Sequence, residues 1–246
     1  GFWSLALDLL IRELPQNGRS LAFTPVGLLA AAGQDSIVRL WNPQTGEVAQ
    51  EFAGHQGALF AVAVSPDGRW LASGGGGDGT APRNQEVRLW DATTGKELAQ
   101  LHEDNGQKPD LPGWVYSIAF SADGKSLAVA SPYAVRIWDL ATRRQTHRLS
   151  KCSYDVAFSP TANRLALPGE FGIYDPESGK QLQALAADVR VQGCVAYSNS
   201  GKILASSDQQ GIIQLWNAET GKELERRTGH TGGIRSVDYS ADGTLA

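Results

Sequence analysis

The sequence contains no methionine, only two cysteines and no apolar run near the roughly 18 residues that a membrane-spanning helix needs. Cys152 and Cys194 cannot form a disulfide framework, and their spacing matches no metal motif. No secretory signal is visible at the start of the chain. We therefore expect a cytoplasmic protein with no membrane contact and no metal. Because methionine is missing even at position 1, we also expect an excised piece of a longer chain, fused to other domains.

An excess of basic charge is also missing. The formal net charge is -4, whereas a nucleic-acid surface is expected to be basic. We therefore expect no nucleic-acid partner. Arg19 and Arg235 are the residues that such binding would use, and they form no basic stripe.

Helical periodicity is almost absent. Instead, a hairpin-like sequence pattern occurs three times. The copies read IVRLWNPQTGEVAQEF (37–52), EVRLWDATTGKELAQL (86–101) and IIQLWNAETGKELERR (212–227). Each alternates apolar and polar residues on both sides of a glycine-containing break. This pattern predicts a strand, a tight turn and a second strand.

The hairpins belong to a longer repeat of 36 to 49 residues. Its markers are an aromatic residue that ends the VRLW-type strand, a strand that leads into a turn such as SPDG, and a short apolar strand between the two. In Ser65-Pro66-Asp67-Gly68, proline presets φ, Asp67 caps the backbone and the glycine takes a positive φ. The unit is therefore four short strands joined by three turns. The aromatic residues are Trp3, Trp41, Trp90, Trp138, Tyr174 and Trp216.

Four-stranded units of this kind bury both faces only by stacking on one another, which predicts an all-β fold and a β-propeller. The segments LWDATTGKE, IWDLAT and LWNAETGKE, with Gly54-His55 and Gly229-His230, resemble the WD40 family, here as a bacterial-type cassette. The resemblance implies one propeller domain over residues 1–246, with five complete four-stranded blades and two terminal half-blades. The ring has six blades if the termini pair and otherwise belongs to a seven-bladed parent. The expected half-blades are 1–14 and 229–246, and the complete blades are 15–53, 54–101, 102–150, 151–187 and 188–228.

The family often contains a buried His-Ser-Trp-Asp hydrogen-bond network that braces a blade. His55, Ser73 and Trp90 are the best candidates, with Asp78 as a possible fourth member. We interpret the group as structural, since a nucleophilic serine needs an exposed hydroxyl beside a base. The stretch GGGGDG (74–79) satisfies a dinucleotide-binding pattern but leads into a strand, not a helix, so we interpret it as a flexible connection.

The departures from the repeat predict the binding site. The connections 75–86 and 102–113 are longer than their counterparts, and in WD40 propellers both lie on the same face. Aromatic and arginine side chains, which interface cores favour, cluster at the start of the innermost strands. Tolerated surface loops and packing against those loops are the alternative interpretation. The predicted partner-binding residues are Arg19, Phe60, Arg83, Trp114, Tyr116, Tyr133, Tyr154, Phe171 and Arg235.

The favoured function is a scaffold or sensor that binds another protein or a peptide segment through this top face. The alternative is a propeller enzyme that acts on a small molecule at the central channel. Asp155 and Asp238 stand as isolated strand residues, so no acid cluster is expected there. We therefore expect no catalytic residues and no cofactor.

Overall fold

The computed structural model describes residues 18–76, 86–101, 114–150, 153–168, 172–185 and 193–246. Within these residues the chain forms five antiparallel sheets, each built from four strands that are consecutive along the sequence. None of the described segments is a helix long and apolar enough to cross a membrane. The expected all-β propeller architecture is confirmed.

The strands of the five sheets have the following bounds. The first sheet holds β1 (Gly18–Phe23), β2 (Leu29–Gly33), β3 (Ile37–Trp41) and β4 (Val48–Ala53), and the second holds β5 (Leu59–Val64), β6 (Trp70–Gly75), β7 (Glu86–Asp91) and β8 (Glu97–Leu101). The third holds β9 (Ser117–Phe120), β10 (Ser126–Ala130), β11 (Val135–Asp139) and β12 (Arg144–Leu149). The fourth holds β13 (Ala157–Phe158), β14 (Leu165–Leu167), β15 (Gly172–Tyr174) and β16 (Gln181–Ala184), and the fifth holds β17 (Val195–Tyr197), β18 (Ile203–Ser207), β19 (Ile213–Asn217) and β20 (Glu223–Arg227).

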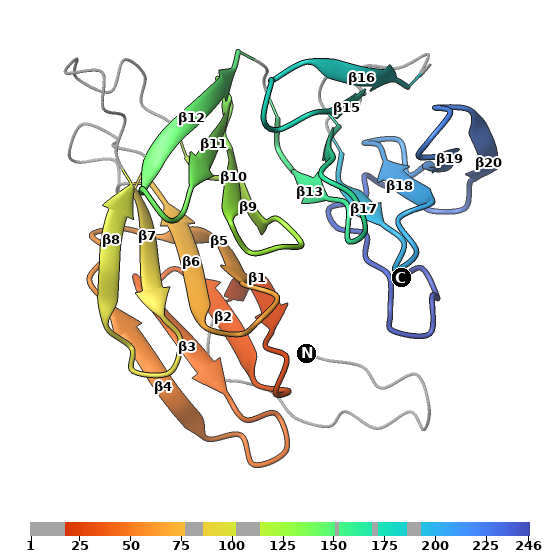
Figure 1. The fold of residues 1–246 in the computed structure, drawn as a ribbon. Coiled ribbons are helices and arrows are strands. Elements are labelled where there is room, and N and C mark those ends of the chain that lie inside the picture. The colour runs from red at the N-terminus through yellow and green to blue at the C-terminus, as the bar shows by residue number, and fades with distance from the viewer. Residues whose placement is uncertain (1–17, 77–85, 102–113, 151–152, 169–171, 186–192) are drawn as a thin grey trace.

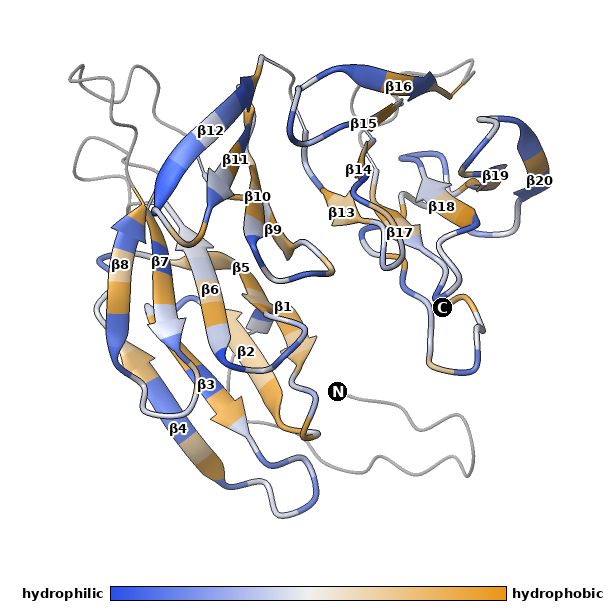
Figure 2. Ribbon diagram, in the orientation of Figure 1, coloured by the Kyte–Doolittle hydropathy of each residue, from blue (hydrophilic) through white to orange (hydrophobic). Residues whose placement is uncertain are grey.

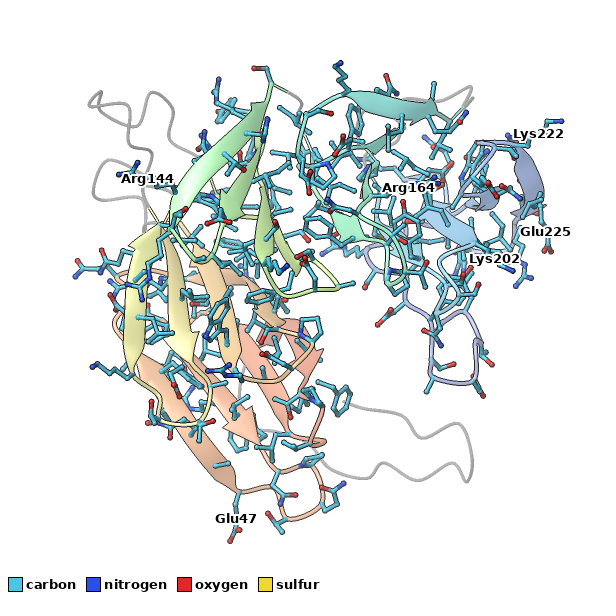
Figure 3. All side chains as sticks on the ribbon, in the orientation of Figure 1. Glu47, Arg144, Arg164, Lys202, Lys222 and Glu225 are labelled. Atoms are coloured by element: carbon cyan, nitrogen blue, oxygen red, sulfur yellow. The ribbon has the colours of Figure 1, made fainter. Side chains whose placement is uncertain are left out.

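The sheets follow one another around a common centre (Figure 1). The first strand of each sheet lies nearest the centre, and the fourth lies at the periphery. Hydrophilic residues dominate the peripheral strand β12, whereas β2 is mostly apolar (Figure 2). Charged side chains such as Glu47, Lys222 and Glu225 point outward from the outer edge (Figure 3). This polarity matches a stack whose apolar surfaces face neighbouring sheets and the centre.

The turns are held by the side chains that the repeat supplies. The Ser65 hydroxyl donates to Asp67 Oδ1 at 2.6 Å, and the amide of Trp70 donates to Ser65 Oγ at 2.9 Å. Gly68 follows with φ of 72°, a left-handed value that only glycine adopts without strain. These local bonds satisfy the backbone groups of a turn and fix the register of the strands on both sides.

The repeated aromatic residues occupy equivalent positions. Trp90 pairs with Leu71 on the preceding strand, and Trp216 pairs with Leu204 in the same way. A register shift in the pairing with the outer strand comes immediately before each of the five aromatic residues, which are Trp41, Trp90, Trp138, Tyr174 and Trp216. The copies are therefore equivalent units of one repeat.

The apolar core lies between the sheets. One cluster joins Phe52 and Leu40 of the first sheet to Leu71 and Trp90 of the second. The next joins Leu89 of the second sheet to residues of the third, and further clusters join the third to the fourth and the fourth to the fifth. A four-stranded sheet cannot cover both of its faces alone, so each sheet depends on its neighbours for burial.

Several expectations about the ends and loops lie outside the described residues or stay predictions. The half-blade 1–14 and most of the two long connections are among the residues not described. In the segment 229–246, Tyr239 forms an isolated antiparallel bridge with Leu245. The division into blades and half-blades, and the choice between six and seven blades, remain predictions.

The interpretation of GGGGDG as a flexible connection was wrong for its first residues. Gly74 and Gly75 belong to strand β6, and Gly74–Gly76 are buried. A Cβ atom at Gly74 would lie 2.4 Å from Val115, and one at Gly75 would lie 2.5 Å from the carbonyl oxygen of Ala58. The glycines are therefore needed for close packing at the end of a strand.

Candidate interaction site

The starts of the innermost strands meet around one central cavity of about 1370 Å³. Each repeat supplies one residue at the same position, two residues before the strand motif that reads VAF or its equivalent. We call this position the mouth register. All six of its residues line the cavity, and they are Arg19, Phe60, Tyr116, Tyr154, Gly193 and Arg235.

Aromatic side chains of the mouth register, together with Trp114, form one continuous row. Phe60 stacks on Trp114 with ring centres 5.4 Å apart and planes 18° apart. Trp114 meets Tyr116 edge to face at 6.1 Å, and Tyr116 meets Tyr154 at 4.9 Å. We define the aromatic row as Phe60, Trp114, Tyr116 and Tyr154. It connects the second, third and fourth sheets through ring contacts at distances that favour aromatic pairing.

An arginine extends the row at its first-sheet end. The Arg19 guanidinium carbon lies 4.5 Å from the centre of the Phe60 ring, a cation–π contact. Arg19 is exposed, Phe60, Tyr116 and Tyr154 are half-buried, and Trp114 is 37% exposed. The rings of the row are therefore held in contact with one another and still offer surface to solvent.

Gly76 allows Trp114 to take its place in the row. A Cβ atom at Gly76 would lie 2.1 Å from Trp114 Cδ1, closer than a real side chain could tolerate. The glycines at the end of β6 thus admit the segment that carries Trp114 and Val115 against the second sheet. The sequence pattern shows a glycine run, but its packing role depends on which residue approaches it.

One step deeper than the mouth register, side chains link neighbouring sheets. Ser20 Oγ accepts a hydrogen bond from the amide of Val62 in the second sheet at 3.1 Å. The Ser117 hydroxyl donates to Asp155 Oδ1 at 2.7 Å, and Asp155 Oδ2 accepts the amide of Val195 at 2.9 Å. Asp155 therefore connects the third, fourth and fifth sheets. We call Ser20, Ser117 and Asp155 the inter-sheet belt.

Asp155 was expected to stand apart from any acid cluster, and the structure adds that its side chain is hydrogen-bonded to the residues around it. Its carboxylate accepts three hydrogen bonds, including one from the amide of Val156. Desolvation raises the pKa of Asp155, and the negative charge of Asp238 raises it further, while the three hydrogen bonds oppose the shift. The signal was available in the sequence, because the residue before each VAF-type motif is small or polar: Ser20, Ala61, Ser117, Asp155, Cys194 and Ser236.

The structure brings His55, Ser73 and Trp90 together. His55 Nε2 lies 2.6 Å from Ser73 Oγ, and Trp90 Nε1 donates to the same oxygen at 2.8 Å. All three side chains are buried, and Ser73 is fully enclosed. A hydroxyl in this position is not accessible to a substrate. A similar bond joins Trp216 Nε1 to Ser206 Oγ at 2.9 Å, which fits the proposal that such groups brace the sheets.

The remaining predicted site residues are separated from the row or lie outside the described residues. Tyr133 is 42% exposed in the turn between β10 and β11, and it is not among the residues that line the cavity. Arg235 is exposed and lines the cavity together with Phe60, Tyr116 and Tyr154. Arg83, Phe171 and the proposed network member Asp78 lie outside the described residues.

The described part of the chain contains no cluster of metal-ligating side chains. Among those residues, no group of three or more His, Cys, Asp or Glu side chains could hold a metal ion. The Asp155 carboxylate is already committed to hydrogen bonds. What the geometry offers is a rigid aromatic surface at the mouth of the cavity.

Comparison with known families identifies the repeat. The sequence matches the profile of the family described as "WD domain, G-beta repeat" over residues 46–91, 106–139, 179–217 and 221–246. Together these matches cover more than half of the chain.

Individual proteins are also similar. The chain is 36% identical to small ribosomal subunit protein RACK1y of Oryza sativa subsp. japonica, over 47% of this chain and 30% of that protein. It is 25% identical to CCR4-associated factor 4 of Saccharomyces cerevisiae, over 89% of this chain and 33% of that protein. It is 26% identical to eukaryotic translation initiation factor 3 subunit I of Coccidioides immitis, over 88% of this chain and 55% of that protein. The alignments thus span from 30% to 55% of the length of these relatives.

Proposed function

Because the chain belongs to the WD domain, G-beta repeat (WD40) family, we propose that it is a protein-interaction scaffold or sensor module. It binds another protein or a peptide segment through the mouth of its central cavity. The contact residues are the aromatic row, with Arg19 and Arg235 on the same mouth register. The proposal extends to Tyr133, Arg83 and Phe171 as peripheral contacts and assigns the whole chain to one propeller domain.

The continuous row of ring contacts carries the proposal. Four aromatic side chains from neighbouring sheets contact one another in sequence, and three of them, Phe60, Tyr116 and Tyr154, line the cavity. The fourth, Trp114, does not line the cavity and is 37% exposed. Aromatic residues bury large areas with few rotatable bonds and dominate the energetics of protein interfaces. A rigid row loses little conformational entropy when a partner docks on it.

The names of the relatives agree with this function. They describe a ribosomal subunit protein, a factor associated with CCR4 and a subunit of a translation initiation factor. Two of these names describe a subunit or a subunit protein, and the third describes an association with another protein. By analogy, we place this chain in a cytoplasmic protein assembly.

The proposal assigns no catalytic step to the channel. Asp155 is the acid closest in sequence to the row, and it accepts three hydrogen bonds from the protein itself. A general base needs a lone pair directed at a substrate proton. We therefore propose that Asp155 connects sheets and that the chain is not an enzyme.

The test is partner capture by photo-crosslinking. A photoreactive amino acid is placed at Tyr154 in the full chain, and the crosslinked partner is compared between the parent chain and the triple substitution of Phe60, Trp114 and Tyr116 to alanine. A matched control carries Leu182→Ala and Leu224→Ala, because both leucines are exposed on outer strands. We expect the triple variant to lose the crosslink and the control to keep it. An unchanged crosslink in a folded triple variant contradicts the proposal.

A further inference from the structure

The charges around the aromatic row indicate which partner it accepts. Several arginines of the described chain are paired with carboxylates. Arg39 contacts Asp35 and Glu51, Arg88 contacts Glu97, and Arg226 contacts Glu223. These arginines lie on the third and fourth strands of their sheets, away from the mouth register.

Arg19 and Arg235 differ from this pattern. Within the described residues, neither guanidinium has a carboxylate or hydrogen-bond partner, and neither is buried. Both line the central cavity at the mouth register. Arg19 is held over Phe60 by its cation–π contact, which orients the guanidinium and leaves its N–H donors available.

The two arginines bracket the aromatic row along the chain order of the sheets. Arg19 belongs to the first sheet, the row covers the second to the fourth, and Arg235 follows the fifth. Only Gly193 stands at the mouth register between Tyr154 and Arg235. In the chain order of the sheets, the mouth therefore presents the Arg19 cation, then the aromatic row, and then the Arg235 cation.

The two described acids that line the same cavity, Asp155 and Asp238, lie at other register positions than the two arginines. Asp155 lies one register step deeper and accepts three hydrogen bonds. Asp238 lies three residues beyond Arg235, and its Oδ1 accepts the amide of Tyr239 at 2.8 Å. Among the described residues, the mouth register carries two positive charges and no negative one.

We propose that the mouth binds an acidic, aromatic-rich or aliphatic-rich peptide segment of the partner, with one carboxylate group facing Arg19, another facing Arg235 and apolar side chains on the aromatic row. This inference rests on the proposed function and adds the chemistry of its partner. Guanidinium–carboxylate hydrogen bonds are among the strongest in proteins, and complementary charges select the partner and its orientation. A basic segment would place like charges against both arginines.

The experiment is a peptide-display selection of random linear peptides on the full chain. We expect the selected peptides to carry two acidic positions separated by apolar residues. A parallel selection on the Arg19→Gln, Arg235→Gln variant loses this acidic preference. Selected peptides that are neutral or basic overturn the inference and leave the proposed function standing.

Affinity measurements on resynthesised peptides then measure the contribution of each of the two acidic positions separately. Replacing each glutamate or aspartate by its amide weakens binding by roughly tenfold or more per position, the effect of losing a charge-assisted hydrogen bond. Increasing salt concentration weakens the binding of the acidic peptide more than the binding of the amide peptide, because salt screens exposed charges. Binding that appears only when the acids are replaced by phosphoserine overturns the choice of carboxylates.

Two outcomes bear on the proposed function itself. The first outcome is that the selected peptides still bind after Phe60, Trp114 and Tyr116 are changed to alanine. The peptides then dock elsewhere, and the aromatic row is not the site. A selection that enriches no peptide contradicts peptide binding at this mouth. A charge reversal provides the positive control, because Arg19→Glu with Arg235→Glu is expected to prefer a lysine-flanked peptide over the original acidic one.

Discussion

At the scale of single residues, Gly76 controls how closely Trp114 approaches the second sheet. A Cβ atom at this position would lie 2.1 Å from Trp114 Cδ1, so Gly76→Ala must displace the indole ring. We expect a loss of stability of about 1–3 kcal/mol from overpacking. We also expect Trp114 to lose its stacked contact with Phe60, and partner capture to fall with it.

Fluorine NMR of chains labelled with fluorotryptophan measures this displacement, with the Trp114 signal assigned by Trp114→Phe. The control is Gly124→Ala, because Gly124 has φ of 68° and a Cβ atom there would meet nothing within 4 Å. That change costs about 1–2 kcal/mol of backbone strain and leaves the Trp114 signal in place. Equal shifts in both variants would show that Gly76 does not position the ring.

The turn aspartates predict how stability depends on pH. A hydrogen bond from Ser65 and the amide of Arg69 lower the pKa of Asp67, and Ser121 and the amide of Lys125 do the same for Asp123. When the pKa of a carboxyl group is lower in the folded state than in the unfolded state, its ionised form stabilises the fold. This stability is fully present at pH values above the unfolded-state pKa, near 3.9, and is lost as the pH falls through the folded-state pKa. We expect the chain to lose stability between about pH 4 and pH 2, since the equivalent Asp242 has its pKa lowered to about 2.

Urea unfolding over that pH range tests the contribution. Asp67→Asn and Asp123→Asn together should flatten the dependence of the unfolding free energy on pH. The side-chain oxygen of each asparagine can still accept the hydrogen bond from the amide of Arg69 or Lys125. A slope that matches the parent chain would exclude these two carboxylates as its source.

At the scale of strands and sheets, Asp155 holds three neighbouring sheets at the channel. Asp155→Ala removes the acceptor for the amide of Val195 and for the hydroxyl of Ser117. Each buried donor left without a partner costs about 1–3 kcal/mol. We expect a clear loss of stability and increased hydrogen exchange in β9 and β17 as well as in β13.

Ser20→Ala is the matched control, because Ser20 holds the equivalent position and accepts one amide, that of Val62. It should destabilise the chain by less than Asp155→Ala, and exchange should increase in β5. Thermal unfolding and hydrogen exchange measure both. An Asp155→Ala variant as stable as Ser20→Ala would mean that the belt does not couple the sheets.

The elements were more predictable than the links between them. The alternation around Trp41, Trp90 and Trp216, and the turn residues beside them, are local signals that fix strands and hairpins. The hydrogen bonds of Asp155 connect residues about 40 positions apart in sequence. No local pattern specifies such a pairing, although the small or polar residue before each VAF-type motif hints at it.

At the scale of the whole molecule, stability is shared between sheets. Leu127 of β10 is fully buried in the cluster that joins the second and third sheets. Leu127→Ala should cost about 2–5 kcal/mol. Hydrogen exchange should increase in β6 and β7 as well as in β10 and β11, and an increase limited to the third sheet would contradict coupling through this interface.

The propeller architecture followed from the repeat, because equivalent units with two apolar faces have to stack. The candidate site was predictable in part. Phe60, Tyr116 and Tyr154 share a repeat position, which places them at one end of the channel. The stacking of Trp114 on Phe60 and the close packing of Gly76 depend on distances between neighbouring sheets. Repeat position alone does not contain that information.

The central claim is that the mouth of the cavity, with its aromatic row, is the docking surface. Hydrogen exchange of the full chain with and without its crosslink-identified partner tests it most directly. We predict that the partner protects the segments 58–61, 114–117 and 153–156 and leaves the outer strands β4, β8, β12, β16 and β20 unchanged. Protection confined to those outer strands, with the three segments unaltered, would contradict the account.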